Sequence, residues 1–232
     1  MYKILVTGGT KGIGAGVAER LRTAGHEVIT CARGRDATIR CDVTVALQVE
    51  QMRDAIGPVD VLINNAGGVR TAPLIKMSES DWDWHFQLNV KSVFLCTKAF
   101  LPSMLKKGFG RVINIASTAG KIGAPYISAY AATKHAVLGL TRSLALEVAD
   151  KGITVNALCP SFVDTPMLHE SAEIISKKTG KPVEELIEAY RIRNPQKRFV
   201  TIGEVASAAQ FLIDNSAVNG QALSLCGGET FS

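Results

Sequence analysis

The sequence predicts an α/β fold: a doubly wound parallel sheet of about seven strands, with helices on both faces. Short apolar runs rich in valine and isoleucine alternate with longer segments of helical period, which is the pattern of βαβ units. The 232 residues, 47% hydrophobic and 20% charged, suffice for a substantial core. No internal repeat, low-complexity segment or linker divides residues 1–232, so we expect a single domain.

Each strand is predicted from an apolar run, and each helix from the periodic segment that follows it. The strands are expected at "YKILVT" (2–7), "EVITCA" (27–32), "VDVLINN" (59–65), "GRVINIAS" (110–117), "ITVNALCP" (153–160) and "ALSLCGG" (222–228), with a short further strand at "ATIRC" (37–41). The helices are expected at 12–24, 44–56, 81–107, 128–149 and 203–214, several after a Thr, Ser or Asp that can cap them.

Residues 162–200 interrupt this alternation. They are polar and helix-prone, and they follow a strand end, where sheets of this kind bind ligands. We interpret them as a lid over a substrate. The alternative is a surface excursion without a function.

Charge and cysteine content limit the classes of partner. The net charge is +5 and the pI near 9.0, but the basic residues are scattered among 21 acidic ones without a basic run. This argues against nucleic acid and favours at most an anionic ligand. The cysteines stand far apart without a CxxC pair, which predicts free thiols in a reducing compartment and no metal site: Cys31, Cys41, Cys96, Cys159 and Cys226.

The start of the sequence and its hydropathy bear on location. The first predicted strand begins almost at the first residue, and no apolar run reaches about 18 residues. We therefore expect a cytoplasmic protein without a membrane segment.

A glycine-rich stretch, "TGGTKGIG" (7–14), lies between the first strand and the first helix. Glycine permits a tight turn and close approach of a ligand, while the helix start offers N–H groups and a positive dipole end to a pyrophosphate. The spacing of Gly8, Gly12 and Gly14 differs from G-x-G-x-x-G, so its position carries the argument. We predict a dinucleotide site in a Rossmann-type sheet; a turn without a ligand is the alternative.

The end of the second strand indicates which dinucleotide binds. A site for NAD(H) carries Asp or Glu there to bond the ribose 2′-OH. Here "TCARGR" offers Arg33 and Arg35, and Lys11 lies in the glycine turn. Three cations suit a 2′-phosphate held by Arg33 or Arg35, so NADP(H) is favoured over NAD(H). Arginines on a solvated loop are the alternative.

Taken in order, the motifs resemble those of the short-chain dehydrogenase/reductase family in its compact single-domain form. The matching residues are "TGGTKGIG", "CDV" (41–43), "NNAG" (64–67), Asn89 with Val90, Ser117, and the Tyr130-Lys134 spacing. More narrowly, "CARG", "CPSFVDTPM" and "LSLCGG" resemble ketoreductases of acyl-thioester and polyketide intermediates. The resemblance also implies a homotetramer or homodimer, with the helices at 81–107 and 128–149 between subunits.

The resemblance implies a set of residues that contact the cofactor: Gly8, Thr10, Lys11, Gly12, Ile13, Gly14, Arg33, Asp42, Val43, Asn65, Ala66, Gly67, Tyr130, Lys134, Val163 and Thr165. Some of these have a structural alternative. Asp42 could cap the following helix, and Thr165 could be an N-cap before Pro166. Of the two asparagines in "NNAG", we expect Asn64 to be structural and Asn65 to lie nearer the cofactor.

Tyr130 and Lys134 would share one helix face. Interconverting a ketone and a secondary alcohol requires hydride transfer at carbon and proton transfer at oxygen. The unperturbed pKa of a phenol is about 10, and a cation at this range favours the phenolate, lowering that pKa by roughly one to three units. We therefore predict Tyr130 as the general acid/base. Packing with a snorkelling lysine is the common alternative for such a pair.

Two further residues complete the predicted catalytic group. Ser117, at the end of the strand before this helix, can hold the substrate oxygen through its hydroxyl. By the resemblance, Lys134 also bonds the nicotinamide ribose, and Asn89 binds a water that links Lys134 to solvent. Three of the four histidines have no evident partners and are left out of the chemistry: His85, His135 and His169.

The chain departs from the family pattern in two places. Only about eight residues separate the second strand from "CDV" (residues 33–40), too few for a full crossover helix. Ser161 replaces the glycine that the family usually carries after the proline at 160.

The sequence thus predicts an NADP(H)-dependent oxidoreductase acting on a small-molecule ketone or alcohol, with a 3-oxoacyl thioester or a cyclic or polyketide ketone as substrate. In the lid, Arg191, Arg193, Lys197 and Arg198 could meet a phosphorylated carrier arm, or simply form a solvated helix end. An NAD(H)-dependent dehydrogenase of a small alcohol, sugar or steroid is the second hypothesis. A catalytically silent dinucleotide-sensing regulator is a hypothesis of another class.

Overall fold

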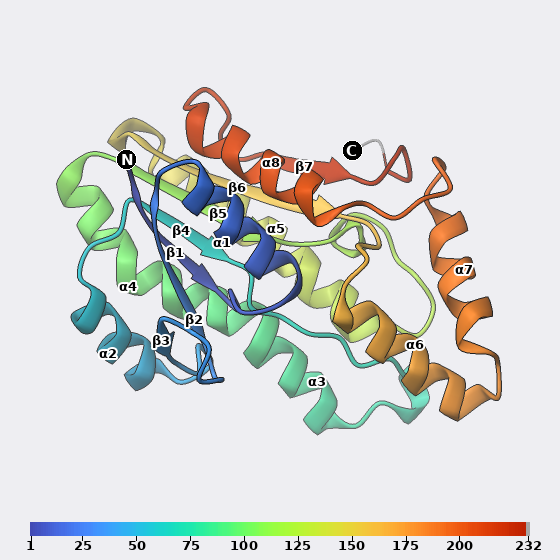
Figure 1. The fold of residues 1–232 in the computed structure, drawn as a ribbon. Coiled ribbons are helices and arrows are strands. Elements are labelled where there is room, and N and C mark those ends of the chain that lie inside the picture. Colours follow the sequence, from blue (N-terminus) through green and yellow to red (C-terminus); the bar gives the residue numbers. More distant parts are fainter. Residues whose placement is uncertain (231–232) are drawn as a thin grey trace.

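One parallel sheet of seven strands organises the molecule (Figure 1). The computed structural model describes residues 1–230, apart from the side chain at position 178. The strand order is β3-β2-β1-β4-β5-β6-β7, and every neighbouring pair is parallel. The strands are β1 (Lys3–Thr7), β2 (Glu27–Ala32), β3 (Ile39–Arg40), β4 (Val61–Asn64), β5 (Gly110–Ile115), β6 (Ile153–Pro160) and β7 (Ala222–Leu225). Each predicted strand is present, so the predicted fold class is confirmed.

Helices cover both faces of the sheet (Figure 1). They are α1 (Gly12–Thr23), α2 (Ala46–Ile56), α3 (Glu79–Phe86), α4 (Ser92–Lys107), α5 (Ser128–Glu147), α6 (Pro166–Thr179), α7 (Val183–Arg193) and α8 (Ile202–Asp214). The two helices at 166–193 occupy the segment predicted to be polar and helix-prone. Figure 1 shows them beyond the carboxyl ends of the strands.

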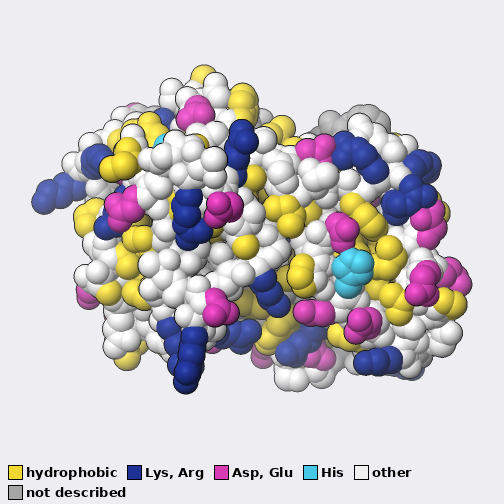
Figure 2. All heavy atoms as spheres, in the orientation of Figure 1, with side chains coloured by type: hydrophobic (Ala, Val, Ile, Leu, Met, Phe, Trp, Pro, Cys, Tyr) yellow, Lys and Arg dark blue, Asp and Glu magenta, His cyan; other side chains and the backbone are white. Residues whose placement is uncertain are grey.

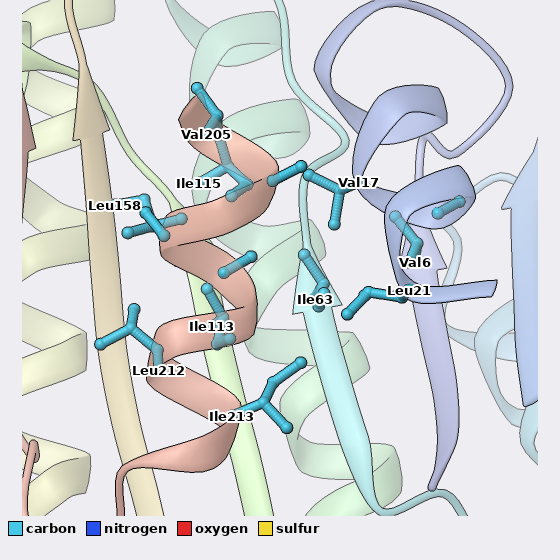
Figure 3. Close-up of a cluster of buried hydrophobic side chains, with 14 of the residues drawn as sticks. Val6, Val17, Leu21, Ile63, Ile113, Ile115, Leu158, Val205, Leu212 and Ile213 are labelled. Atoms are coloured by element: carbon cyan, nitrogen blue, oxygen red, sulfur yellow. The ribbon is translucent and has the colours of Figure 1, made fainter. Parts of the chain in front are cut away.

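The core follows from the two-residue period of the strands. In β1, Ile4 and Val6 pack in the layer that contains Leu212 of α8, whereas Leu5 between them packs in the opposite layer with Phe100 of α4. All five side chains are at most 1% exposed. Figure 3 shows the first of these layers, where α1 and α8 lie together on the sheet. This burial on both faces fixes the register of the strands and therefore the positions of the loops at their ends.

The segment predicted as one α-helix over 81–107 is interrupted at its centre. A π-helical turn at Gln87–Lys91 joins α3 to α4, so the prediction of a continuous α-helix is wrong there. The π turn widens the helix by one residue, and Asn89 within it is 1% exposed. Such turns occur frequently at functional sites.

The connection from β2 to β3 contains no helix, as its length predicted. Thr30 and Thr38 hold this short connection, because each backbone N–H donates to the other residue's hydroxyl at 3.2 Å. No crossover helix between β2 and β3 therefore covers this end of the sheet.

The outer surface mixes charges of both signs. On the face drawn in Figure 2, basic and acidic side chains are interspersed. Within residues 1–230, no helix combines the length and apolar character that crossing a bilayer requires.

Candidate active site

The turn after β1 and the loop after β4 are hydrogen-bonded to each other. β1 and β4 are neighbours in the sheet, and the order in which strands are added reverses between them. Thr7 Oγ1 accepts hydrogen bonds from the backbone N–H groups of Asn65 and Ala66, both at 3.0 Å. In return, Asn65 Nδ2 donates to the backbone oxygens of Thr7 at 2.9 Å and Gly8 at 3.0 Å. Gly8 has φ +63°, a left-handed conformation that suits glycine. Thr7 opens the glycine stretch, but this role of its hydroxyl was not predicted.

The two asparagines of "NNAG" both serve the protein's own backbone and core. Asn64 Nδ2 donates to Thr97 Oγ1 at 3.1 Å and to Asn114 Oδ1 at 2.9 Å, which is the structural role expected of it. The amide nitrogen of Asn65 is used in holding the glycine turn. A contact between Asn65 and a cofactor stays a prediction.

The start of α1 carries the donors that a pyrophosphate needs. Lys11 occupies the N-cap position without a side-chain cap, so the first N–H groups of the helix have no capping side chain. Gly12 has φ +54°, and a Cβ built on it would lie 3.5 Å from Thr165 Cγ2. The hydroxyl of Thr165 makes no capping bond to α6 although the residue occupies the N-cap position, with Pro166 at the start of that helix. These groups are suited to bind a pyrophosphate that lies between the glycine turn and α6.

The N-terminal part of α6 lies beside the glycine turn. Lys11 Nζ is 4.0 Å from Glu170 Oε1, and both side chains are more than half exposed. Val163, between β6 and α6, is buried and forms an isolated parallel bridge with Val200. Both ends of the 162–200 segment are thus anchored at the sheet edge that carries the glycine turn.

The residues predicted for the adenosine side lie at the ends of β2 and β3. Arg33 and Arg35 are exposed directly after β2. Asp42 Oδ1 accepts hydrogen bonds from Thr44 N at 3.0 Å and Thr44 Oγ1 at 2.7 Å. Asp42 therefore stabilises the turn before α2 and does not cap the helix, whose N-cap is Val45. That alternative interpretation of Asp42 was wrong by three residues.

Ser117, Tyr130 and Lys134 meet where β5 leads into α5. The Ser117 hydroxyl accepts a hydrogen bond from Ala119 N at 3.1 Å and is also hydrogen-bonded to the Tyr130 phenol. Lys134 Nζ lies 5.6 Å from the centre of the Tyr130 ring and donates to Ile115 O at 2.8 Å. Lys134 is 6% exposed and Tyr130 is partly exposed. The structure thus brings together three of the four side chains that the sequence selected for catalysis.

The pKa values of Tyr130 and Lys134 differ from the expected ones. Burial raises the pKa of Tyr130, and the hydrogen bond with Ser117 offsets this only in part. Burial also lowers the pKa of Lys134 to about 8. The expectation that Lys134 brings the pKa of the phenol below its usual value is therefore wrong for the protein alone, because desolvation penalises the phenolate and the ammonium alike.

Asn89 holds the loop that follows "NNAG". Its Oδ1 accepts from Gly68 N at 2.9 Å, and its Nδ2 donates to Gly68 O at 3.0 Å and Thr133 Oγ1 at 3.2 Å. A Cβ on Gly67 would lie 3.0 Å from Asn89 Oδ1 and 3.8 Å from Lys134 Nζ, so the loop passes close to both. The water path from Lys134 stays a prediction, and both N–H bonds of the Asn89 amide are already used.

His85 joins the loop at Arg70 to α3 through its two ring nitrogens, a contact that the sequence did not reveal. It is fully buried, its Nδ1 lies 2.7 Å from Asp81 O, and its Nε2 accepts from Arg70 N at 3.0 Å. Burial lowers its pKa, which keeps the ring neutral as this pattern requires. The Arg70 guanidinium stacks over Trp84 at 4.0 Å and pairs with Asp81 at 2.6 Å.

The other two histidines also have partners. His135 Nδ1 lies 2.9 Å from Ala131 O within its own helix, and His169 Nε2 lies 2.7 Å from Asp164 Oδ1. The expectation that these three histidines lack partners was therefore wrong, whereas their exclusion from the chemistry stays a prediction.

The four cations predicted to meet a carrier arm are engaged within the chain. Arg191 pairs with Glu188 at 2.6 Å, Arg193 with Glu229 at 3.0 Å, and Arg198 with Glu204 at 2.8 Å. Lys197 Nζ donates to Ile192 O at 3.0 Å. An anionic carrier arm would have to compete with these intramolecular acceptors.

Replacing Lys134 with methionine is expected to remove a pH dependence of stability. The unfolded lysine holds its proton up to a pKa of 10.5, but the folded one only up to about 8, so the unfolded state binds more protons between these values. The free energy of unfolding of the wild type should therefore rise with pH in that window, by about 3 kcal/mol from this residue. Urea unfolding of both proteins from pH 7.5 to 10.5 measures this. Parallel curves would contradict the buried, weakened ammonium.

Comparison with known proteins agrees with this geometry. The family model described as short chain dehydrogenase matches residues 2–175. The protein named "Putative ketoacyl reductase" of Streptomyces coelicolor is 40% identical, over 97% of this chain and 95% of that protein. D-beta-hydroxybutyrate dehydrogenase of Rhizobium meliloti is 34% identical over 97% of both chains.

Solved structures have the same fold. A variant of actinorhodin polyketide ketoreductase solved with NADPH superposes with a TM-score of 0.92 at 38% identity, covering 98% of this chain and 96% of that one. The structure of ElxO with NADP bound has a TM-score of 0.87 at 31% identity and covers 99% of both chains. The chain belongs to the short chain dehydrogenase family and is an oxidoreductase.

Proposed function

We propose that this protein reduces a ketone to a secondary alcohol with NADPH, and catalyses the reverse oxidation, with Tyr130 as the general acid/base. The observation that carries the proposal is the meeting of Ser117, Tyr130 and Lys134 at the end of β5, on the same sheet edge as the glycine turn.

The proposed chemistry assigns one task to each side chain. The bound dinucleotide supplies the hydride that reaches the carbonyl carbon. Ser117 donates a hydrogen bond to the carbonyl oxygen, and the Tyr130 phenol gives that oxygen its proton. Lys134 stabilises the resulting phenolate, which is then reprotonated from solvent. Because the raised pKa of Tyr130 keeps the phenol protonated near neutral pH, the resting site is set for reduction.

Several observations support NADP(H) as the coenzyme. The glycine turn, the uncapped start of α1 and the hydroxyl of Thr165 suit a pyrophosphate. Arg33 and Arg35 follow β2 directly, where an NAD(H) site would place a carboxylate. Two similar solved structures were obtained with NADPH and with NADP. NAD(H) is the second candidate.

The relatives support a ketone carried by an acyl chain or a polyketide. One is named for ketoacyl reduction and another for polyketide ketoreduction, and we propose a 3-oxoacyl thioester or a cyclic ketone as substrate. We further propose that residues 162–200 form the lid over it. A small 3-hydroxy acid is the second candidate, supported by the relative named as a D-beta-hydroxybutyrate dehydrogenase.

We also propose a homotetramer or homodimer. The exposed faces of α4 and α5, which carry Phe94 and Leu146, would lie between subunits. Light scattering of the purified protein measures the mass, and a monomer at micromolar concentration would refute this part.

A coenzyme-linked activity screen tests the function directly. Turnover with NADPH on 3-oxoacyl thioesters and cyclic ketones, followed at 340 nm, should exceed turnover with NADH. Replacing Arg33 and Arg35 together with alanine should raise KM for NADPH about tenfold to a hundredfold and leave KM for NADH nearly unchanged, because only the 2′-phosphate loses charge-assisted hydrogen bonds. Arg53→Ala, an exposed arginine on α2, is the control. A preference for NADH in the wild type would overturn the coenzyme assignment.

A further inference from the structure

A largely buried carboxylate joins the lid to the end of the sheet. The Glu229 side chain is only 9% exposed, although the residue lies near the C-terminus. One of its oxygens accepts a hydrogen bond from Ser161 Oγ, and the other accepts one from Arg193 Nε at 3.0 Å. Three separate segments therefore meet at one carboxylate: the loop after β6, the last turn of α7 and the segment after β7.

Phe162, the residue after Ser161, contacts α7 one turn before Arg193. Phe162 stacks on Tyr190 with the ring centres 4.6 Å apart and the planes 12° from parallel. Tyr190 and Arg193 are three residues apart and so share one face of α7. The Arg193 guanidinium also lies 5.8 Å from the centre of the Phe162 ring. Residues 161 and 162 thus contact α7 at two successive turns.

The position of Glu229 is fixed by its own loop. Ser161 N donates to Leu225 O at 2.9 Å, and Glu229 N donates to Cys226 O at 3.2 Å. Gly227 has φ +59°, and a Cβ there would lie 2.0 Å from Asn194 Oδ1, so the loop passes directly over the residue that ends α7. The Glu229 carboxylate is thereby held beside the end of α7.

Beyond these contacts, α7 packs against α6 and is bonded to the segment after it by Lys197, which donates to Ile192 O. None of its residues is buried, and its pair Arg191 and Glu188 lies within the helix and is exposed. An isolated helix of 11 residues is marginal in water, so α7 depends on its docking contacts. The Glu229 side chain is 9% exposed and that of Arg193 is 41% exposed, so removal of one partner leaves a largely desolvated carboxylate with a single hydrogen bond. The contact at Glu229 is therefore sensitive to a single substitution.

We propose that Ser161, Arg193 and Glu229 form a clasp that holds α7 in its docked position and thereby sets the affinity of the site for the ketone. The three are positioning residues, since none of them touches the reacting atoms. The inference rests on the proposed ketone reduction only in its kinetic part, because docking of α7 is measurable without turnover. The serine that departs from the family pattern has its role here, as the partner of a carboxylate.

Hydrogen exchange tests docking in the protein without ligands. In Glu229→Gln, the amides of α7 should exchange about tenfold faster than in the wild type, because an amide cannot offer two charged oxygens to Ser161 and Arg193. The amides of β4 and β5 should keep their wild-type rates, which excludes general unfolding. Glu188→Gln makes the same change in the exposed ion pair within α7 and should raise the exchange of α7 by no more than about twofold.

Kinetics and a double variant complete the test. Glu229→Gln and Arg193→Ala should each raise KM for the ketone about five- to twentyfold with kcat within threefold, and the double variant should be no worse than the worse single one. Additive effects, unchanged exchange in α7, or an equal effect of Glu188→Gln would overturn the clasp. If the wild type turned over no ketone, the proposed function would fail, and the exchange experiment would still decide on the clasp.

Discussion

Replacing Tyr130 with phenylalanine is expected to lower kcat for ketone reduction by about a hundredfold to ten-thousandfold, the range that a positioned general acid contributes. The ring remains, so its packing beside Ser117 and the cation–π contact with Lys134 at 5.6 Å should persist. Only the phenolic O–H that would protonate the carbonyl oxygen is lost. The Kd for NADPH, measured by fluorescence titration, should change less than threefold.

The matched control removes a phenolic hydroxyl far from the site. Tyr2 stacks between His26 and Phe109 near the amino end of β1, opposite the edge that carries Ser117. Tyr2→Phe should therefore keep wild-type kcat and KM. Undiminished turnover in Tyr130→Phe would remove Tyr130 from the mechanism. Loss of coenzyme binding in that variant would instead show that the ring itself shapes the dinucleotide site.

The pH dependence of the wild type provides a second view of the same residue. Because burial raises the pKa of Tyr130, the phenol stays protonated through neutral pH, and reduction should be nearly independent of pH from 6 to 7, below the pKa of about 8 at which Lys134 loses its charge. Oxidation of the alcohol needs the phenolate and should accelerate as pH rises. A maximum of the reduction rate below pH 6 would contradict this assignment.

The fold was predictable because its signal is local and repeated. Each strand is a short valine- and isoleucine-rich run, and every one recurs in the sheet within a few residues of its expected bounds. The absent crossover helix followed from counting the residues between β2 and β3. The π turn at Gln87–Lys91 could not be predicted, because one additional residue per turn leaves the 3.6-residue hydrophobic period of the flanking helices almost unchanged.

The site was predictable where neighbours in sequence decide the geometry. The four-residue spacing of Tyr130 and Lys134 on a helix is enough to bring the two side chains together. Their pKa values were not predictable, because they are dominated by burial, which depends on segments far apart in the chain. The bonds from His85 to the loop at Arg70, and from Glu229 to Ser161 across 68 residues, likewise exist only in the folded chain.

Replacing Gly14 with alanine is the second change with a large expected effect. A Cβ at this position would lie 2.4 Å from the backbone oxygen of Gly8 and 2.4 Å from Asn65 Nδ2. Neither atom can move away easily. The Gly8 oxygen belongs to the backbone, and Asn65 Nδ2 is fixed by its hydrogen bonds to Thr7 O and Gly8 O. The methyl group therefore separates the start of α1 from the turn that it supports, an overpacking that typically costs about 1–3 kcal/mol.

The consequence for function should exceed the loss of stability. Because the same displacement moves the N–H groups of α1 away from the pyrophosphate, Kd for NADPH should rise at least tenfold, measured by fluorescence titration at a temperature where circular dichroism shows the variant folded. Gly203→Ala, in the exposed first turn of α8, adds the same methyl group with only one neighbour, 3.9 Å away, and should bind NADPH as the wild type does. If Gly14→Ala lost stability but kept its affinity for NADPH, the glycine turn would be a packing device and the dinucleotide would have to bind elsewhere on the sheet edge.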